Sequence, residues 1–75
     1  MTTKQIRITY KPLWKLLIDL KMSKTELRKK TKIAASTFTK MNNDQYVSLD
    51  VLARICKELH CTFDDVVQLE KLENL

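Results

Sequence analysis

The chain has 75 residues, of which 44% are hydrophobic and 31% are charged, and its formal net charge is +5. This length fits one small domain, since so short a chain buries only about 60% of the surface that it exposes when unfolded. No apolar run approaches the roughly 18 residues of a membrane helix, and we expect neither a membrane segment nor a signal peptide. The single histidine and the absence of glycine argue against a histidine metal cluster, a catalytic triad and a glycine-rich phosphate loop.

The two cysteines, Cys56 and Cys61, stand five residues apart. Five residues along a helix turn the chain by about 140°, which is poor geometry for a disulfide. We therefore predict that both thiols are reduced in a cytoplasmic protein, and that Cys56 is a small buried apolar residue.

The charges are distributed unevenly along the chain. Residues 1–42 contain eleven lysines and arginines and two acids, a balance of +9, whereas residues 43–75 contain three bases and seven acids, a balance of −4. Such a division indicates that one side of the domain faces a polyanion and the other faces solvent or a partner. A solvated lysine surface accounts for the charge equally well, so charge alone leaves both interpretations open.

Alternating apolar residues predict a short strand over residues 4–10, with Ile6, Ile8 and Tyr10 on one side. A lone strand is not stable in water, so this one must pair with another chain, pack on the domain or act as an ordered arm. The simplest expectation is that it pairs with its own copy in a second subunit. Pro12 stands where a helix can begin. The leucines that follow at positions 13, 16, 17 and 20 have the spacing of an amphipathic helix. Trp14 lies off that stripe, where it would cover the N-terminal strand.

Two further helices follow in the basic half. Ser23 and Glu26 have the spacing of a capping box, which predicts a helix from there to about residue 30. The next helix is predicted over residues 34–42, with Phe38 and Met41 inward. Ser36 and Lys40 each lie about 160° around the helix from Phe38 and are expected to point outward.

The acidic half predicts two more helices. Ser48 is expected to cap a helix with the apolar stripe Leu52, Ile55, Cys56 and Leu59. Residues 62–65 have a second capping-box-like pattern, which predicts a fifth helix containing Phe63, Val66 and Val67. Leucines at positions 69, 72 and 75 either extend that helix or fray.

The order and spacing of these segments resemble the Cro/repressor (XRE) helix-turn-helix family. Residues 22–41 resemble its two central helices, residues 48–59 its fourth helix and residues 63–67 its fifth. The resemblance implies an all-α, compact five-helix repressor-like domain over residues 11–69. A short N-terminal strand or arm over residues 1–10 and a C-terminal tail over residues 70–75 would flank it.

The resemblance also implies a role for each matching position. The base-contacting residues would be Ala35, Ser36, Thr37 and Lys40, and the phosphate-contacting residues would be Ser23, Lys24, Asn43 and Gln45. Short hydroxyl groups and lysine suit base edges and phosphates, and alanine suits a thymine methyl group. Two positions depart from the family: Arg28 replaces a common alanine, and Lys32 replaces a turn glycine. We expect Arg28 to reach solvent or to shift its helix slightly, and Lys32 either to accept the backbone of the turn or to change it.

These observations predict a cytoplasmic transcriptional regulator that binds double-stranded DNA by occupying an operator. We expect a homodimer, because one such domain offers only about 600–1,000 Å² to DNA. No cofactor, metal, catalytic residue or small-molecule substrate is expected, since one histidine and scattered acids provide no convergent site. The alternative is a protein-interaction module, such as an antitoxin or a regulator-binding protein.

Overall fold

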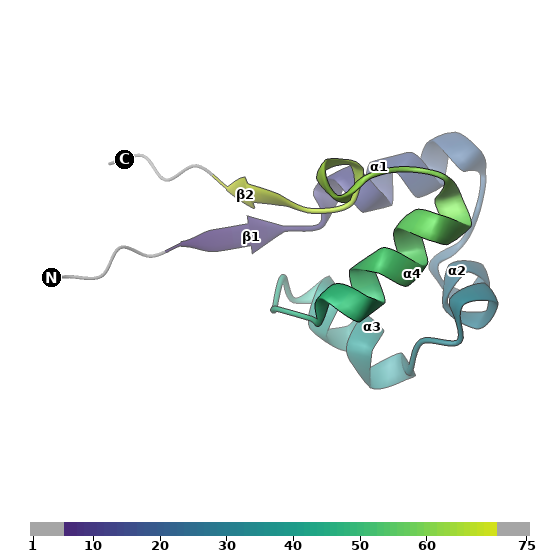
Figure 1. Cartoon of the computed structure of the whole chain (residues 1–75), viewed down its shortest axis with the longest axis horizontal. Helices are drawn as coiled ribbons and strands as arrows, with labels where there is room; N and C mark the ends of the chain where they lie inside the picture. Colours follow the sequence, from purple (N-terminus) through teal and green to yellow (C-terminus); the bar gives the residue numbers. More distant parts are fainter. Residues whose placement is uncertain (1–5, 71–75) are drawn as a thin grey trace, which may run out of the picture.

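The computed structural model describes residues 6–70, which form two short strands, four helices and one 3-10 turn. In chain order these are β1 (Arg7–Thr9), α1 (Lys11–Leu20), α2 (Lys24–Thr31), α3 (Ala35–Asn42), α4 (Leu49–Leu59), the 3-10 turn η1 (Phe63–Asp65) and β2 (Gln68–Glu70). Figure 1 shows the two strands side by side, extending away from the body that the helices form.

The helices begin where short-range signals predict. The hydroxyl of Ser23 accepts a hydrogen bond from the Glu26 N–H at 3.0 Å, and the Glu26 carboxylate accepts one from the Ser23 N–H at 3.5 Å. The hydroxyl of Ser48 accepts a bond from the Val51 N–H at 3.2 Å. Each bond satisfies an N–H group that the first turn of a helix leaves free. The predicted starts of α2 and α4 are confirmed, as is Pro12 in the first turn of α1.

After each helix the backbone enters the left-handed region, which favours glycine. The residues in this conformation are Lys21 after α1, Lys32 after α2, Asp44 after α3 and His60 after α4, with φ between 56° and 58°. Of the two alternatives predicted for Lys32, the first holds, because this residue accepts the backbone of the turn between α2 and α3. Its N–H bonds to the carbonyl of Lys29 at 3.3 Å, and the next N–H, of Ile33, bonds to that of Arg28 at 3.2 Å.

The hydrophobic core receives side chains from all four helices and from the segment after η1. Its buried members are Tyr10, Leu13, Leu17, Leu27, Ile33, Phe38, Met41, Leu52, Ile55, Cys56 and Val66. The predicted inward faces of α3 and α4 are confirmed. The leucine stripe of α1 is buried only in part, because Leu20 at its C-terminal end is 47% exposed.

The predicted fifth helix is wrong. Residues 63–65 form a single 3-10 turn, after which the chain becomes extended. The predicted cap is present, since the Asp65 carboxylate accepts a hydrogen bond from the Thr62 N–H at 3.1 Å, but a cap satisfies only the first turn. Val66 is fully buried in the core and its backbone is still in the right-handed helical region, whereas the β-branched residue that follows, Val67, favours extended backbone. The chain therefore leaves the turn as a strand.

The partner of the N-terminal strand is also different from the prediction. β1 pairs antiparallel with β2 of the same chain, with Ile8 opposite Leu69 and Arg7 opposite Glu70, rather than with a second subunit. The Arg7 and Glu70 side chains also form an exposed ion pair at 3.8 Å. Over the described residues the fold is thus mostly helical, as predicted, with four helices in place of five and a small two-stranded sheet that includes the predicted N-terminal strand. Of the predicted C-terminal leucine row, Leu72 and Leu75 lie outside the described residues.

Candidate nucleic-acid interface

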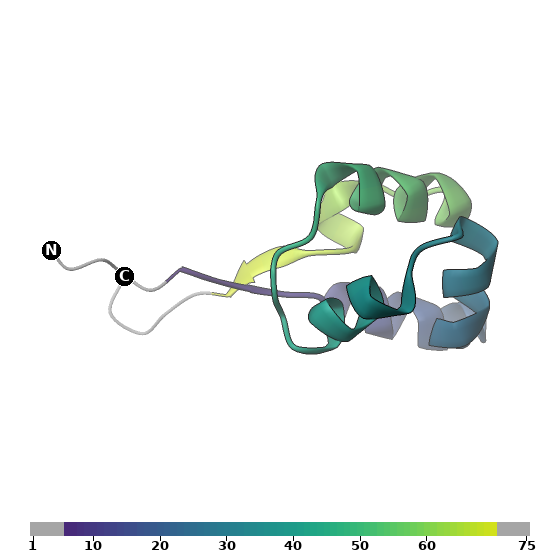
Figure 2. The same ribbon diagram turned by 90° about the horizontal axis from the view of Figure 1, so that it is seen from below.

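Helices α2 and α3 are joined by a short turn whose geometry depends on buried side chains on both sides. Leu27 of α2, Ile33 of the turn and Phe38 of α3 are all buried in the common core. They hold the two helices in the arrangement visible in Figure 1, with α2 at the right and α3 at the lower centre, and seen from below in Figure 2. The result is a helix-turn-helix unit, in which the second helix is the one presented to a ligand.

Helix α3 has a buried face and a polar exposed face. Phe38 and Met41 are buried, as the sequence predicts. Of the four predicted base-contacting residues, Ala35, Ser36 and Lys40 are exposed and Thr37 is half-buried. Ser36 and Lys40 are four residues apart and therefore lie one above the other on the same face. The exposed face can offer one hydroxyl and one ammonium group to base edges.

Lys24, at the first position of α2, is held by side chains from two other helices. Its ammonium nitrogen donates a hydrogen bond to Asn42 Oδ1 at 2.7 Å, at the end of α3. The same nitrogen lies 3.9 Å from the centroid of the Trp14 ring, on α1. Trp14 also packs against Phe38, with ring centroids 6.4 Å apart. The expectation that Trp14 covers the N-terminal strand is therefore wrong, because the ring faces the helix-turn-helix unit.

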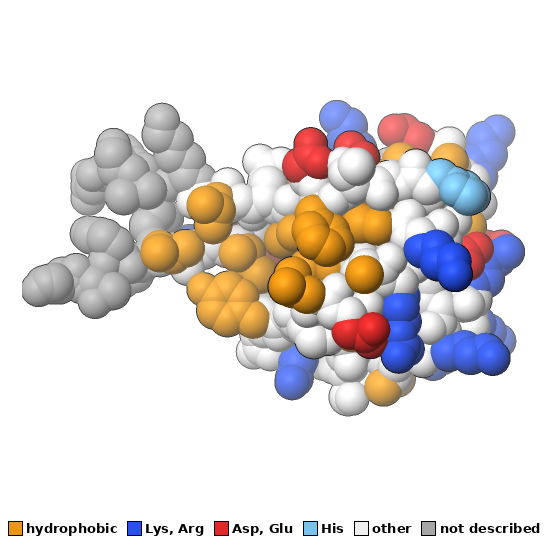
Figure 3. Space-filling view, viewed as in Figure 1, with side chains coloured by type: hydrophobic (Ala, Val, Ile, Leu, Met, Phe, Trp, Pro, Cys, Tyr) orange, Lys and Arg blue, Asp and Glu red, His pale blue; other side chains and the backbone are white. Residues whose placement is uncertain are grey.

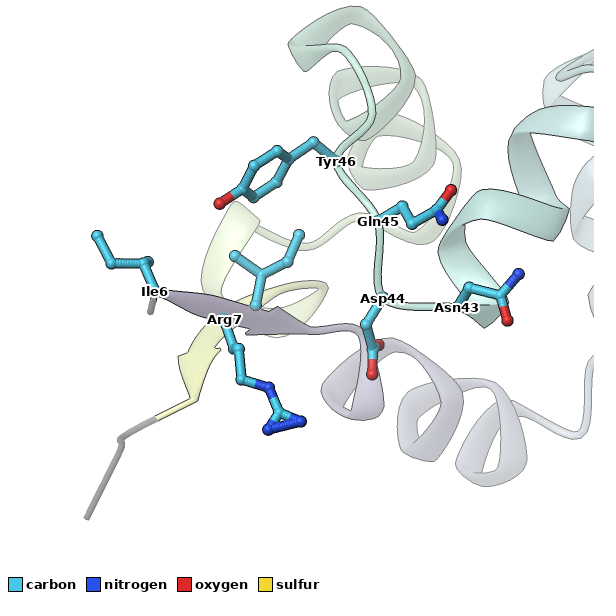
Figure 4. A pocket seen from close by; sticks show the side chains of 7 residues that line it. Ile6, Arg7, Asn43, Asp44, Gln45 and Tyr46 are labelled. Carbon is cyan, nitrogen blue, oxygen red and sulfur yellow. The ribbon is translucent and has the colours of Figure 1, made fainter. Parts of the chain in front are cut away.

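The other three predicted phosphate-contacting residues are exposed, and each also takes part in a hydrogen bond within the protein. The hydroxyl of Ser23 caps α2. The side-chain amide of Asn43 donates to the Thr39 carbonyl at 3.1 Å. The backbone carbonyl of Gln45 accepts a hydrogen bond from the Tyr10 hydroxyl at 2.8 Å, and its side chain remains exposed. Figure 4 shows Asn43 and Gln45 on the loop between α3 and α4, where it passes beside β1.

The basic residues of α2 do not all have the same surroundings. Lys29, Lys30 and Lys32 are exposed. Arg28 is half-buried and lines a shallow hollow between α2 and α3, together with Lys24 and Thr39. No acidic residue lines this hollow. The substitution of the family's alanine by Arg28 therefore places a further cation beside the exposed face of α3.

Sequence reasoning missed the two residues that contact Lys24. Trp14 carried one usable signal, its position off the leucine stripe, but the direction it faces depends on how α1 crosses the other helices. For Asn42 the sequence contains no such signal, because Asn42 and Lys24 are 18 residues apart and come into contact only in the folded chain.

Outside this interface, the structure also bears on the predictions about thiols, metal ions and membrane segments. Cys56 and Cys61 are free thiols and Cys56 is buried, as predicted. Within residues 6–70, no cluster of histidine, cysteine and acidic side chains is suited to hold a metal ion. In the same part of the chain, every helix is too short or too polar to cross a membrane.

A capped α2, a tight turn and an α3 with a polar exposed face define a helix-turn-helix domain of the DNA-binding class. The chain belongs to the Cro/C1-type helix-turn-helix DNA-binding domain family, which matches residues 12–71. It is similar to the crystal structure of the transcriptional regulator VanUg, with 40% sequence identity, coverage of 96% of each chain and a TM-score of 0.88. A comparison with curated proteins finds no match. The chain is thus a DNA-binding regulator of this family.

Proposed function

We propose that this protein is a sequence-specific, double-stranded DNA-binding transcriptional regulator that acts in the cytoplasm by occupying an operator. Helix α3 enters the major groove, and occupancy blocks or recruits RNA polymerase. The observation that carries the proposal is the exposed face of α3, with Ser36 and Lys40 in line, beside the restrained ammonium of Lys24. Family membership and the similarity to a transcriptional regulator support it.

The proposed contacts divide into two kinds. Ser36, Thr37 and Lys40 would bond to base edges, and Ala35 would meet a thymine methyl group, so these residues specify sequence. Ser23, Lys24, Asn43 and Gln45 would bind phosphates. Such contacts position the domain without specifying sequence.

A salt series measured by fluorescence anisotropy tests the proposal. Binding to phosphates releases counterions, so log affinity falls with log salt by about 0.9 per phosphate neutralised. Three or four phosphate contacts per subunit give a slope of about −3 for one subunit and about twice that for two. No binding to any duplex at low salt would refute the proposal and favour a protein-interaction module. Selection of bound duplexes from a random pool then tests sequence specificity.

We further propose that the protein acts as a homodimer, joined through an apolar patch on the sheet. The patch consists of Ile6, Ile8, Tyr46 and Leu69, of which Ile6, Tyr46 and Leu69 are 62–68% exposed. Ile8 and Leu69 are directly opposite in the sheet and so share a face, and Tyr46 lines a hollow with Ile6 and Ile8. Figure 3 shows apolar side chains gathered over the sheet and the adjoining helical surface.

A second copy of this chain is the occupant that the patch favours. An apolar surface is complementary to itself, as a twofold interface requires, whereas the basic helices would repel their own copy. The loop that carries Tyr46 follows α3 directly, and a twofold axis through the patch would relate the α3 helices of the two subunits, as the half-sites of a pseudo-palindrome are related. Sedimentation of the DNA-free protein over a concentration series should show a dimer, and Tyr46→Glu should make it a monomer. A wild-type monomer at high concentration would refute this interface.

A further inference from the structure

Lys24 is an exposed cation whose ammonium group contacts two other side chains. A lysine side chain has a flexible four-carbon stem, and its ammonium group ordinarily samples many positions. Here the ammonium donates to Asn42 at 2.7 Å and lies 3.9 Å over the Trp14 ring. Two groups from two different helices therefore restrain one charge on the surface of the helix-turn-helix unit.

The restraining groups are themselves held in place. Trp14 is half-buried and its ring packs against Phe38, which is only 5% exposed. A cation within about 6 Å of a tryptophan face is attracted by the ring quadrupole, and tryptophan is the strongest such partner among the side chains. Asn42 is the last residue of α3, so its position follows that of the recognition helix.

The ammonium group retains bonding capacity toward a ligand. It has three N–H donors, and Asn42 receives one of them. The indole ring attracts the charge without accepting a strong hydrogen bond. Lys24 is exposed and lines the hollow between α2 and α3 with Arg28, in which no carboxylate competes for the charge. An anion that approaches this hollow therefore meets the Lys24 ammonium in a position that is already fixed.

We propose that Trp14 and Asn42 are positioning residues that hold the Lys24 ammonium ready to bind one DNA phosphate. This inference rests on the proposed function and deepens it. Ordering a long side chain on binding has a cost in conformational entropy, and a side chain that is already ordered avoids that cost. The saving corresponds to about a two- to tenfold gain in affinity per subunit. The gain is independent of DNA sequence, because it is realised at a phosphate.

A double-mutant cycle tests the proposal, using a short duplex of arbitrary sequence. Trp14→Leu keeps an apolar contact for Phe38 and removes the ring face. It should weaken binding about two- to tenfold in the wild-type background and have no effect in the Lys24→Ala background. The slope of log affinity against log salt should stay unchanged in Trp14→Leu, because Lys24 keeps its charge, and should flatten by about one unit in Lys24→Ala. Trp14→Phe should restore part of the lost affinity.

The exposed residue Asn42 provides a variant with little risk of unfolding. Asn42→Ala removes the hydrogen bond and should weaken binding in the same sequence-independent way. Lys57→Ala on α4 is the matched control, since it removes an equal exposed charge outside the hollow that Lys24 lines. Trp14 is the single tryptophan of the chain, so its emission reports on this site. DNA should change the emission of the wild type and leave that of Lys24→Met unchanged.

The outcomes distinguish this proposal from the proposed function. If the wild type binds no duplex, the proposed function fails and this inference fails with it. If the wild type binds but Trp14→Leu weakens binding equally in both backgrounds, Trp14 acts through the fold alone and only this inference fails. If Trp14→Leu or Asn42→Ala tightens binding, the two residues withhold the ammonium from phosphate, which also overturns it.

Discussion

The hydroxyl of Tyr10 donates a hydrogen bond to the backbone carbonyl of Gln45 at 2.8 Å. This bond joins the end of the N-terminal strand to the loop after α3, across 35 positions of the sequence. The Tyr10 N–H bonds to Asp44 Oδ1 at 3.3 Å and reinforces the connection. The Tyr10 ring is also buried in the core. Tyr10 therefore fixes both the end of β1 and the loop that follows the recognition helix α3.

Tyr10→Phe tests how much the hydrogen bond from the Tyr10 hydroxyl contributes to the free energy of unfolding. The substitution keeps the ring and leaves the Gln45 carbonyl without its partner, so we expect a loss of about 0.5–1.5 kcal/mol in the free energy of unfolding. Urea denaturation followed by circular dichroism measures it. Tyr46→Phe is the control, because that ring is 68% exposed, and its effect should stay within about 0.5 kcal/mol. Equal effects of the two substitutions would contradict the prediction.

Removing the exposed polar groups of α3 should change DNA binding and leave the fold intact. We expect Ser36→Ala and Lys40→Ala to leave the melting temperature nearly unchanged, since both side chains are exposed. Each should reduce the preference for the selected duplex over an unrelated one, by about 1–3 kcal/mol where a base contact is lost. Competition anisotropy with the two duplexes measures the preference. Unfolding of either variant would show that these side chains support the core.

Substitutions on the buried face of α3 should instead destabilise the fold. Phe38 is 5% exposed and contacts Trp14, and Phe38→Ala should cost about 3–5 kcal/mol. A domain this small has about that much stability from its core, so the variant should be largely unfolded by circular dichroism. A folded Phe38→Ala protein would mean that the core can close around the missing ring.

The turn between α2 and α3 contains backbone strain that a single substitution can relieve. Lys32 has φ of 58°, which costs a residue with a Cβ atom roughly 1–2 kcal/mol. Lys32→Gly removes this cost but adds backbone entropy to the unfolded chain, so we expect a net gain of about 0.5–1 kcal/mol. Lys29→Gly, inside α2, should instead lose about 1 kcal/mol. Chemical denaturation without DNA compares them, and a loss in both variants would show that the turn is unstrained.

Alkaline pH should destabilise the fold through two titratable groups, the half-buried Cys61 and the buried Tyr10. Burial, and then the neighbouring Cys56, raise the pKa of Cys61 from 9.0 to about 11. Burial, and then the Asp44 carboxylate, also raise the pKa of Tyr10 above 10.0. A raised pKa means that the folded chain holds the proton more tightly, so this stabilisation is complete below the unfolded pKa and is lost as pH rises through the folded pKa.

For Cys61 the loss should therefore fall between pH 9.0 and about 11. The melting temperature, followed by circular dichroism, should drop across this window in the wild type and drop less in Cys61→Ala. Identical pH profiles would show that the thiol has the same pKa in the folded and unfolded chains.

The starts of α2 and α4 and the two faces of α3 were determined by the sequence alone. A capping box such as Ser23 with Glu26 acts over three residues, and helical periodicity places Phe38 and Ser36 on opposite sides whatever else the chain does. These signals are complete within one or two helical turns. They were enough to indicate the helix-turn-helix unit, whereas the residues proposed to meet DNA were implied by the resemblance to the family.

Only the tertiary structure decided the partner of β1, the path of residues 66–70 after η1 and the direction of Trp14. The three-residue strand β2 has no pattern of its own that outweighs its helix-like leucine spacing, and it forms because Val66 is buried and β1 is within reach. The contact of Trp14 with Lys24 and Phe38 depends on how α1 crosses α2 and α3. Contacts of this kind join residues far apart in sequence, and the packing of the whole core decides them.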